Sequence, residues 1–232
     1  LFFYYKPLSK NPVSRLGHEF HDRPGRDFFE RAARVLQMHP DSLAHRAYVY
    51  GFLCHFALDT LSHDYVAEKE AASGLSHARI ESELERALML RDGLDPASHR
   101  PTGHLVPSEE NAAVIADFFP EVTQEQVLDS LRGMVFYLDL LVAPSALKRW
   151  VIFTALRLAG QFEKLGGLVV GPDPEPRCED SNAELLRRFD RAAELAARLI
   201  GDFDRVVESG QAEDPIYGRT FDPKPEQEAA NA

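Results

Sequence analysis

Residues 51–66, GFLCHFALDTLSHDYV, place polar side chains four residues apart within an otherwise apolar run. A step of four residues advances only about 40° around an α-helix, whereas successive side chains of a β-strand alternate between two faces. His55, Asp59 and His63 therefore lie on one stripe of a predicted helix. Polar groups in apolar surroundings need partners, and a metal ion would supply one for each of them. The run predicts a helix with metal-ligand side chains along one face.

The helical spacing of apolar residues continues through most of the chain, between breaks marked by proline and glycine. The longest strand-like segment is GLVVG, at residues 167–171. We therefore predict an all-α fold, with residues 1–16 extended or irregular. The predicted helices cover about residues 24–39, 42–70, 76–93, 108–118, 123–142, 144–165 and 181–209, and a long loop covers residues 92–108.

The length of 232 residues, with 44% hydrophobic and 27% charged residues, fits one domain with a sizeable core. We predict a single domain over residues 1–209 and a poorly ordered tail over residues 210–232, because the segment DPKPEQEAANA is polar and rich in proline. The sequence begins at Leu1 without a methionine and inside the apolar run LFFYY, so we expect the natural N-terminus to lie upstream.

The formal net charge of −11 excludes a global basic field that would attract phosphates. Duplex nucleic acid is therefore not an expected partner. No apolar run approaches the roughly 20 residues that span a bilayer, so no transmembrane segment is expected. Cys54 and Cys178 are the two cysteines, far apart in sequence, and they predict no disulfide framework. This cysteine usage favours a reducing, cytoplasmic location.

The spacing of the stripe limits how many metal ions it can serve. At about 1.5 Å of rise per residue, His55 and His63 are ~12 Å apart along the helix axis. Zinc–imidazole bonds measure only about 2.0–2.1 Å, so two ions with Asp59 between them suit the stripe better than one.

Two further pairs of metal-ligand residues flank the stripe in sequence. His77 and Glu81 stand one turn apart on the next predicted helix, which we expect to be an antiparallel neighbour. His18 and His21, in the segment GHEFH, are one turn apart or lie in a tight turn.

Four segments together resemble the zinc-dependent phospholipase C family, in particular its bacterial branch. These segments are FFYYKPLSKNPVSRLGHEFH, GFLCHFALDTLSHDYV, SHARIESELERALMLRDG and LLVAPSALKRW. The similarity runs over most of residues 1–220. In secreted phospholipases C and the related fungal single-strand nucleases, such residues build a trinuclear zinc site among helices. The resemblance implies a multi-helix bundle of that kind.

The resemblance also implies ligands for a first zinc ion. His55 and Asp59 would bind it with one histidine of GHEFH, for which His21 is the better match and His18 the reserve. Asp59 would bridge towards a second ion.

His63, His77 and Glu81 are implied as the ligands of another zinc ion, which gives two or three ions in all. The family also uses an aspartate just before the FFYY segment and a histidine nearer the N-terminus, and its secreted members use an N-terminal tryptophan. These positions precede Leu1, so the resemblance implies partial zinc loading of this chain.

The implied chemistry is hydrolysis of a phospholipid or other phosphoester by a metal-activated water. Asp59 is the candidate catalytic residue, because it would fix the distance between the ions and can take the proton of the water. Two alternatives stay open. One is a phosphohydrolase that uses the adjacent His63 and Asp64 as metal ligands, and the other is a non-catalytic helical protein with a structural metal or a binding pocket.

Overall fold

The computed structural model describes residues 1–7 and 9–222. The α-helices are α1 Pro12–His21, α2 Gly25–Met38, α3 Leu43–Ser73, α4 His77–Arg91, α5 Glu109–Ala116, α6 Gln124–Leu141, α7 Ala146–Leu158, α8 Phe162–Leu165 and α9 Glu179–Ser209. Within the described residues there is no β-strand, and one isolated bridge joins Pro24 to Thr220. The predicted all-α class is confirmed.

The helix boundaries follow the sequence signals closely. Ser108 and Ser145 cap α5 and α7, each accepting a hydrogen bond from the backbone N–H three residues on. Gly74 and Gly93 follow α3 and α4 with φ values of 68° and 73°, a left-handed conformation that glycine adopts without a steric penalty. The loop predicted at residues 92–108 lies between α4 and α5.

The prediction that residues 1–16 are irregular was wrong in part. Pro12 opens α1, and the Asn11 side chain accepts a hydrogen bond from the backbone N–H of Ser14 at 2.8 Å. Proline suits the first helical position, because the backbone N–H it lacks would have no intrahelical acceptor there. A short 3₁₀ turn, Phe2–Tyr4, precedes α1.

The prediction of one helix over residues 144–165 was also wrong in part. α7 ends at Leu158, and Gly160 adopts a φ of 65°, which interrupts the helix before α8 begins at Phe162. This glycine acts as a helix stop.

The chain divides into two compact units. Unit 1 contains residues 1–63, 105–135 and 190–232, and unit 2 contains residues 64–104 and 136–189. Both units draw on α3, α6 and α9, whose residues cross the boundaries of this division. The sequence-based assignment of one domain over residues 1–209 therefore stays a prediction.

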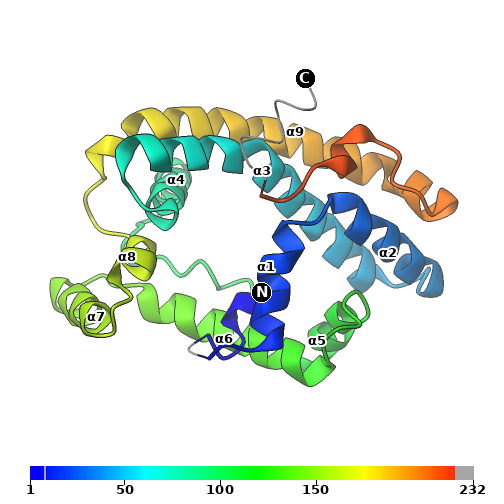
Figure 1. Ribbon diagram of the computed structural model, residues 1–232, viewed down its shortest axis with the longest axis horizontal. Coiled ribbons are helices and arrows are strands. Elements are labelled where there is room, and N and C mark those ends of the chain that lie inside the picture. The colour runs from blue at the N-terminus through cyan, green and yellow to red at the C-terminus, as the bar shows by residue number, and fades with distance from the viewer. Residues whose placement is uncertain (8, 223–232) are drawn as a thin grey trace. The chain divides into compact units, whose positions relative to one another are not determined.

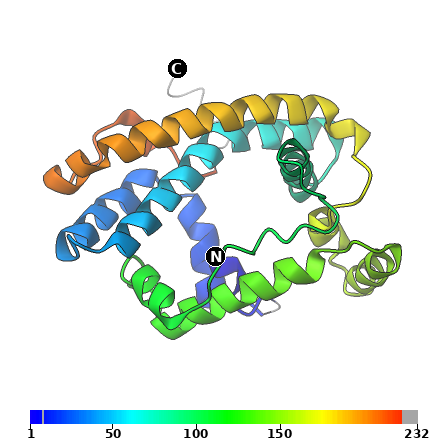
Figure 2. The same cartoon turned by 180° about the vertical axis from the view of Figure 1, so that it is seen from behind.

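The core of unit 1 is dominated by phenylalanine. Phe28 and Phe29 of α2 are buried, and the ring centroids of Phe28 and Phe52 of α3 lie 3.9 Å apart. Phe118 and Phe119 follow α5 and belong to the same core. In the view from behind, α5, in green, lies below α2 (Figure 2). Burying a phenylalanine side chain contributes about 1.5–3 kcal/mol, so this cluster is a major source of stability for the unit.

Within each unit, the part of α3 that belongs to it lies alongside the matching part of α9 (Figure 1). In unit 1, Ala57 packs against Ala192 and Ala196. In unit 2, Lys69 pairs with Asp180 at 2.6 Å. Small apolar contacts support this pairing in unit 1, and charged contacts support it in unit 2.

The tail predicted to be poorly ordered from residue 210 instead packs as far as residue 222. Ala212, Tyr217 and Phe221 are buried in the core of unit 1, around the 3₁₀ turn Pro215–Gly218. The apolar residues of this polar segment are spaced so that each reaches the core, which a count of composition does not reveal. Residues 223–232 lie outside the described part of the chain.

Unit 2 has its own small core, formed by Val66, Leu75, Ile80, Leu84, Cys178 and Leu185. Glu83 is 2% exposed and lies within ion-pair distance of Arg79 and Arg86, at 3.8 and 3.9 Å. Arg86 also donates a hydrogen bond to the carbonyl of Gly171 at 2.6 Å. A buried carboxylate is thus matched by two guanidinium groups.

Among the described helices, none has by itself the length and apolar character needed to cross a bilayer. α6 and α7, taken together across the bend between them, pass the same test of length and composition.

Candidate metal centre

Three side chains with metal-ligand atoms converge in unit 1. His21 comes from the last turn of α1, and His55 and Asp59 come from successive turns of α3. One ligand atom from each lies within 4.8 Å of the other two. His55 Nε2 is 3.1 Å from Asp59 Oδ2. The structure therefore brings together the first ligand set that the sequence indicated, with His21 as the histidine from GHEFH.

The ring of His21 is held in one orientation by the backbone. Its Nδ1 lies 2.7 Å from the carbonyl oxygen of Gly17. A carbonyl can only accept, so Nδ1–H donates this bond and Nε2 keeps its lone pair. Burial lowers the pKa of His21, and the neutral imidazole it favours is the form that binds metal. Histidine ligands in metal sites characteristically donate their other ring N–H in this way.

Asp59 is the most deeply placed member of the group. Its side chain is 11% exposed, whereas that of His55 is 48% exposed. His63 Nε2 lies 3.9 Å from the second carboxylate oxygen, Oδ1, so Asp59 faces an imidazole on each side along α3. The group has a buried anionic base and an opening to solvent at His55.

Asp222 is a neighbour of this group that the sequence analysis missed. Its Oδ1 lies 3.7 Å from His63 Nδ1, and its backbone N–H donates to the carbonyl of His21 at 3.2 Å. The residue falls in the segment predicted to be poorly ordered. The sequence shows only an aromatic residue, Phe221, directly before it. In the structure Phe221 is buried and anchors this segment.

Aromatic rings surround the histidines. Phe221 lies against His55 and His21, with centroid distances of 5.6 and 5.9 Å. Phe52 lies 5.8 Å from His55, and Phe3 lies 5.4 Å from His21. The imidazoles thus sit at an apolar edge of the core.

His18, the reserve ligand, occupies a different position. It is exposed, and its ring lies 4.5 Å from that of Phe3 in an edge-on arrangement. On α1, His18 is three residues from His21, and only His21 belongs to the group with His55 and Asp59. The choice that the sequence left open falls on His21.

The second predicted ligand set has members in both units. His63 lies in unit 1 beside Asp59, while His77 and Glu81 lie in unit 2, where His77 Nε2 is 3.0 Å from Glu81 Oε1. The turn spacing of the His77 and Glu81 pair is as predicted. The joint ligation of an ion by all three stays a prediction.

Asp64, the partner of His63 in the alternative doublet site, has another role in unit 2. Its carboxylate accepts a hydrogen bond from Arg188 at 2.6 Å. Arg188 also reaches Glu184 at 2.9 Å. This arrangement engages Asp64 in an ion-pair network and disfavours it as a metal ligand.

The residues of the first set fit a zinc ion. Two imidazoles and one carboxylate are a donor set found in zinc sites that keep a position open for water. Bonds of about 2.0–2.1 Å in tetrahedral geometry imply ligand atoms about 3.3 Å apart, close to the 3.1 Å between His55 and Asp59. The hydrogen bond from His21 to Gly17 supplies the orienting contact such sites use.

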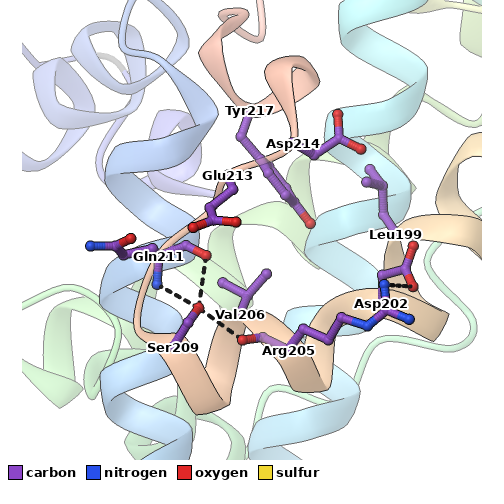
Figure 3. A pocket seen from close by; sticks show the side chains of 9 residues that line it. All are labelled: Leu199, Asp202, Arg205, Val206, Ser209, Gln211, Glu213, Asp214 and Tyr217. Atoms are coloured by element: carbon purple, nitrogen blue, oxygen red, sulfur yellow. Dashed lines mark hydrogen bonds and ion pairs between the residues drawn. The ribbon is translucent and has the colours of Figure 1, made fainter.

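A separate pocket of about 200 Å³ lies in unit 1, between the end of α9 and residues 211–217 (Figure 3). Among its charged groups, Arg205 pairs with Asp202, and Asp214 pairs with Arg198 outside the pocket. None of the predicted ligands lines it. The pocket therefore shows no chemistry that connects it with the histidines.

Comparisons of the chain with protein-family models, with curated proteins and with solved structures give no match.

Proposed function

We propose that this protein is a zinc-dependent phosphoesterase that hydrolyses a phosphodiester of the phospholipid class. The observation that carries the proposal is the convergence of His21, His55 and Asp59 from two helices. The sequence resemblance to zinc-dependent phospholipases C supports the same assignment.

His21, His55 and Asp59 would hold one ion. A zinc ion, when bound, lowers the pKa of a coordinated water towards about 7 and offsets charge on phosphoryl oxygens. A local cation is needed here, because a protein with a net charge of −11 otherwise repels a phosphate.

The chain's own residues shape the environment of the reaction. Asp59 is buried and can hold a proton at its carboxylate, with imidazoles on both sides. Phe221 and Phe52 present apolar rings beside His55. Such surfaces exclude water and suit a phosphoester that carries a hydrocarbon part.

The experiment is hydrolysis of a chromogenic phosphocholine diester by zinc-loaded protein. We expect turnover in the wild type and at least a 100-fold loss in Asp59→Asn, which keeps the size of the side chain and removes its charge. Glu68→Gln is the matched control: it removes one charge from an exposed position of the same helix and should leave turnover unchanged.

Metal analysis by elemental mass spectrometry distinguishes binding from catalysis. Stoichiometric zinc in the wild type, reduced by one equivalent in Asp59→Asn, supports the ligand assignment. If zinc-loaded protein turns over no phosphodiester, phosphomonoester or single-stranded nucleic acid, the enzymatic assignment is wrong. The metal would then have a structural role. Turnover of single-stranded nucleic acid alone would replace the phospholipase with a nuclease.

A further inference from the structure

A second group of ligand side chains lies elsewhere in unit 1, where three helices end or begin. His39 follows α2, His45 lies in the first turn of α3, and Asp117 follows α5. Ligand atoms of these three residues lie within 4.8 Å of one another. None of them belongs to the site proposed above.

The two imidazoles share a single carboxylate oxygen. Asp117 Oδ2 lies 3.0 Å from His45 Nε2 and 3.6 Å from His39 Nε2. These distances bracket the separation of about 3.3 Å expected between ligand atoms of a tetrahedral zinc ion. The separations from the carboxylate oxygen to the two imidazoles therefore suit ligands of one ion.

His45 is the anchored member of this group. Its side chain is 7% exposed, and its Nδ1 lies 2.6 Å from the hydroxyl of Ser42. A serine hydroxyl can donate or accept. Without metal, it can donate to Nδ1 while Nε2–H donates to Asp117. With metal, it can accept from Nδ1–H and leave the Nε2 lone pair to the ion. The Ser42 hydroxyl can therefore hold the His45 ring in place both with and without a bound metal ion.

His39 and Asp117 form the open side of the group. Their side chains are 41% and 46% exposed, so an ion can enter from solvent. The rings of His39 and His45 are stacked, 4.3 Å apart at an angle of 6°. A nitrogen lone pair lies in the plane of its ring, so binding turns the exposed His39 ring towards the ion while His45 stays in place. This motion gives up the stacking on His45, and the exposure of the His39 side chain leaves room for it.

We propose that His39, His45 and Asp117 form a binding site for a divalent ion of the zinc type that ties the ends of α2, α3 and α5 together. Imidazole and carboxylate ligands suit zinc, nickel and cobalt, and three protein ligands leave a position for water. Phe118 is fully buried directly after Asp117, and it holds this carboxylate at the group. The expected role is structural, because the ion would join three helix ends.

The test compares zinc stoichiometry in wild-type protein and in His39→Ala by calorimetric titration of chelator-treated samples. We expect the variant to lose one equivalent and the visible absorption that Co²⁺ gives at this site. Asp117→Asn should behave in the same way. His104→Ala is the matched control, because it removes an exposed histidine from a loop. This variant should bind as many equivalents of zinc as the wild type.

Circular dichroism tests whether each variant is folded. His39→Ala should fold, because the His39 side chain is exposed and its removal leaves no cavity in the core. Zinc should raise the midpoint of thermal unfolding more in the wild type than in His39→Ala. Equal stoichiometry and equal Co²⁺ spectra in folded wild type and His39→Ala would overturn the proposal. The difference between the two proteins does not depend on Asp59, so the result is independent of the proposed phosphoesterase site.

Discussion

His63 Nδ1 lies 3.7 Å from the carboxylate of Asp222, and its Nε2 faces Asp59 at 3.9 Å. At 3.7 Å the carboxylate lies beyond hydrogen-bond distance from Nδ1, so it acts on the His63 ring through its charge. The segment that ends at Asp222 therefore contributes to the electrostatics beside the candidate metal centre.

Asp222→Asn should weaken zinc binding by a few-fold at low salt, because it removes a negative charge that acts on His21 and His63. Competition with a chromogenic chelator measures the change. Glu213→Gln is the control, because it removes the same charge from an exposed position in the same segment. Equal affinities for the two variants would show that Asp222 does not act on the site.

Gly133→Ala should destabilise the protein by about 1–3 kcal/mol, the usual cost of overpacking. A Cβ atom at this position of α6 would overlap the backbone carbonyl of Tyr4. Gly51→Ala, on the open face of α3, meets no atom within 4 Å and should stabilise by about 0.5–1 kcal/mol. Denaturant unfolding gives both values. A destabilised Gly51→Ala or a neutral Gly133→Ala would contradict the packing described.

Arg86→Met should cost about 3–5 kcal/mol, because it leaves the buried carboxylate of Glu83 with one guanidinium partner instead of two. Unfolding in denaturant is the measurement. The double variant Glu83→Gln/Arg86→Met removes the charge as well and should be more stable than Arg86→Met alone. If the double variant is less stable, the loss comes from packing and from the hydrogen bond to Gly171.

Cys54 and Cys178 should differ sharply in reactivity. Cys54 is exposed, whereas Cys178 is fully buried, and burial raises the pKa of its thiol. The raised pKa keeps this thiol protonated at mildly alkaline pH, where the thiolate is the reactive form. We expect a maleimide to label Cys54 alone in the native protein and both cysteines in denaturant, as read by mass spectrometry. Native labelling of Cys54→Ser would contradict the burial of Cys178.

The helix limits that the sequence predicted well are those with strong local signals. α5 and α7 start at capping serines, and α3 and α4 stop before glycine, so their limits depend on residues close in sequence. α1 is not among the predicted helices, although Pro12 suits the first helical position and Asn11 caps it.

From residue spacing alone, the candidate site was predictable only where it lies on one helix, and His21 was implied by the family resemblance. The four-residue spacing of His55 and Asp59 on α3 places them together without further information. The choice of His21 over His18 depends on how α1 packs against Phe3 and α3. Asp222 depends on the docking of Phe221, a contact between residues far apart in the chain. No local pattern reports such a contact.

Phe221 covers the two histidines from the last stretch of chain that the structure describes. Phe221 is synthesised after His21 and His55, because it follows them in the chain. Until then His21 has Phe3 and His55 has Phe52 beside it, and both lack the third ring. The surroundings of the two imidazoles are therefore completed only when this last described stretch of the chain packs against them.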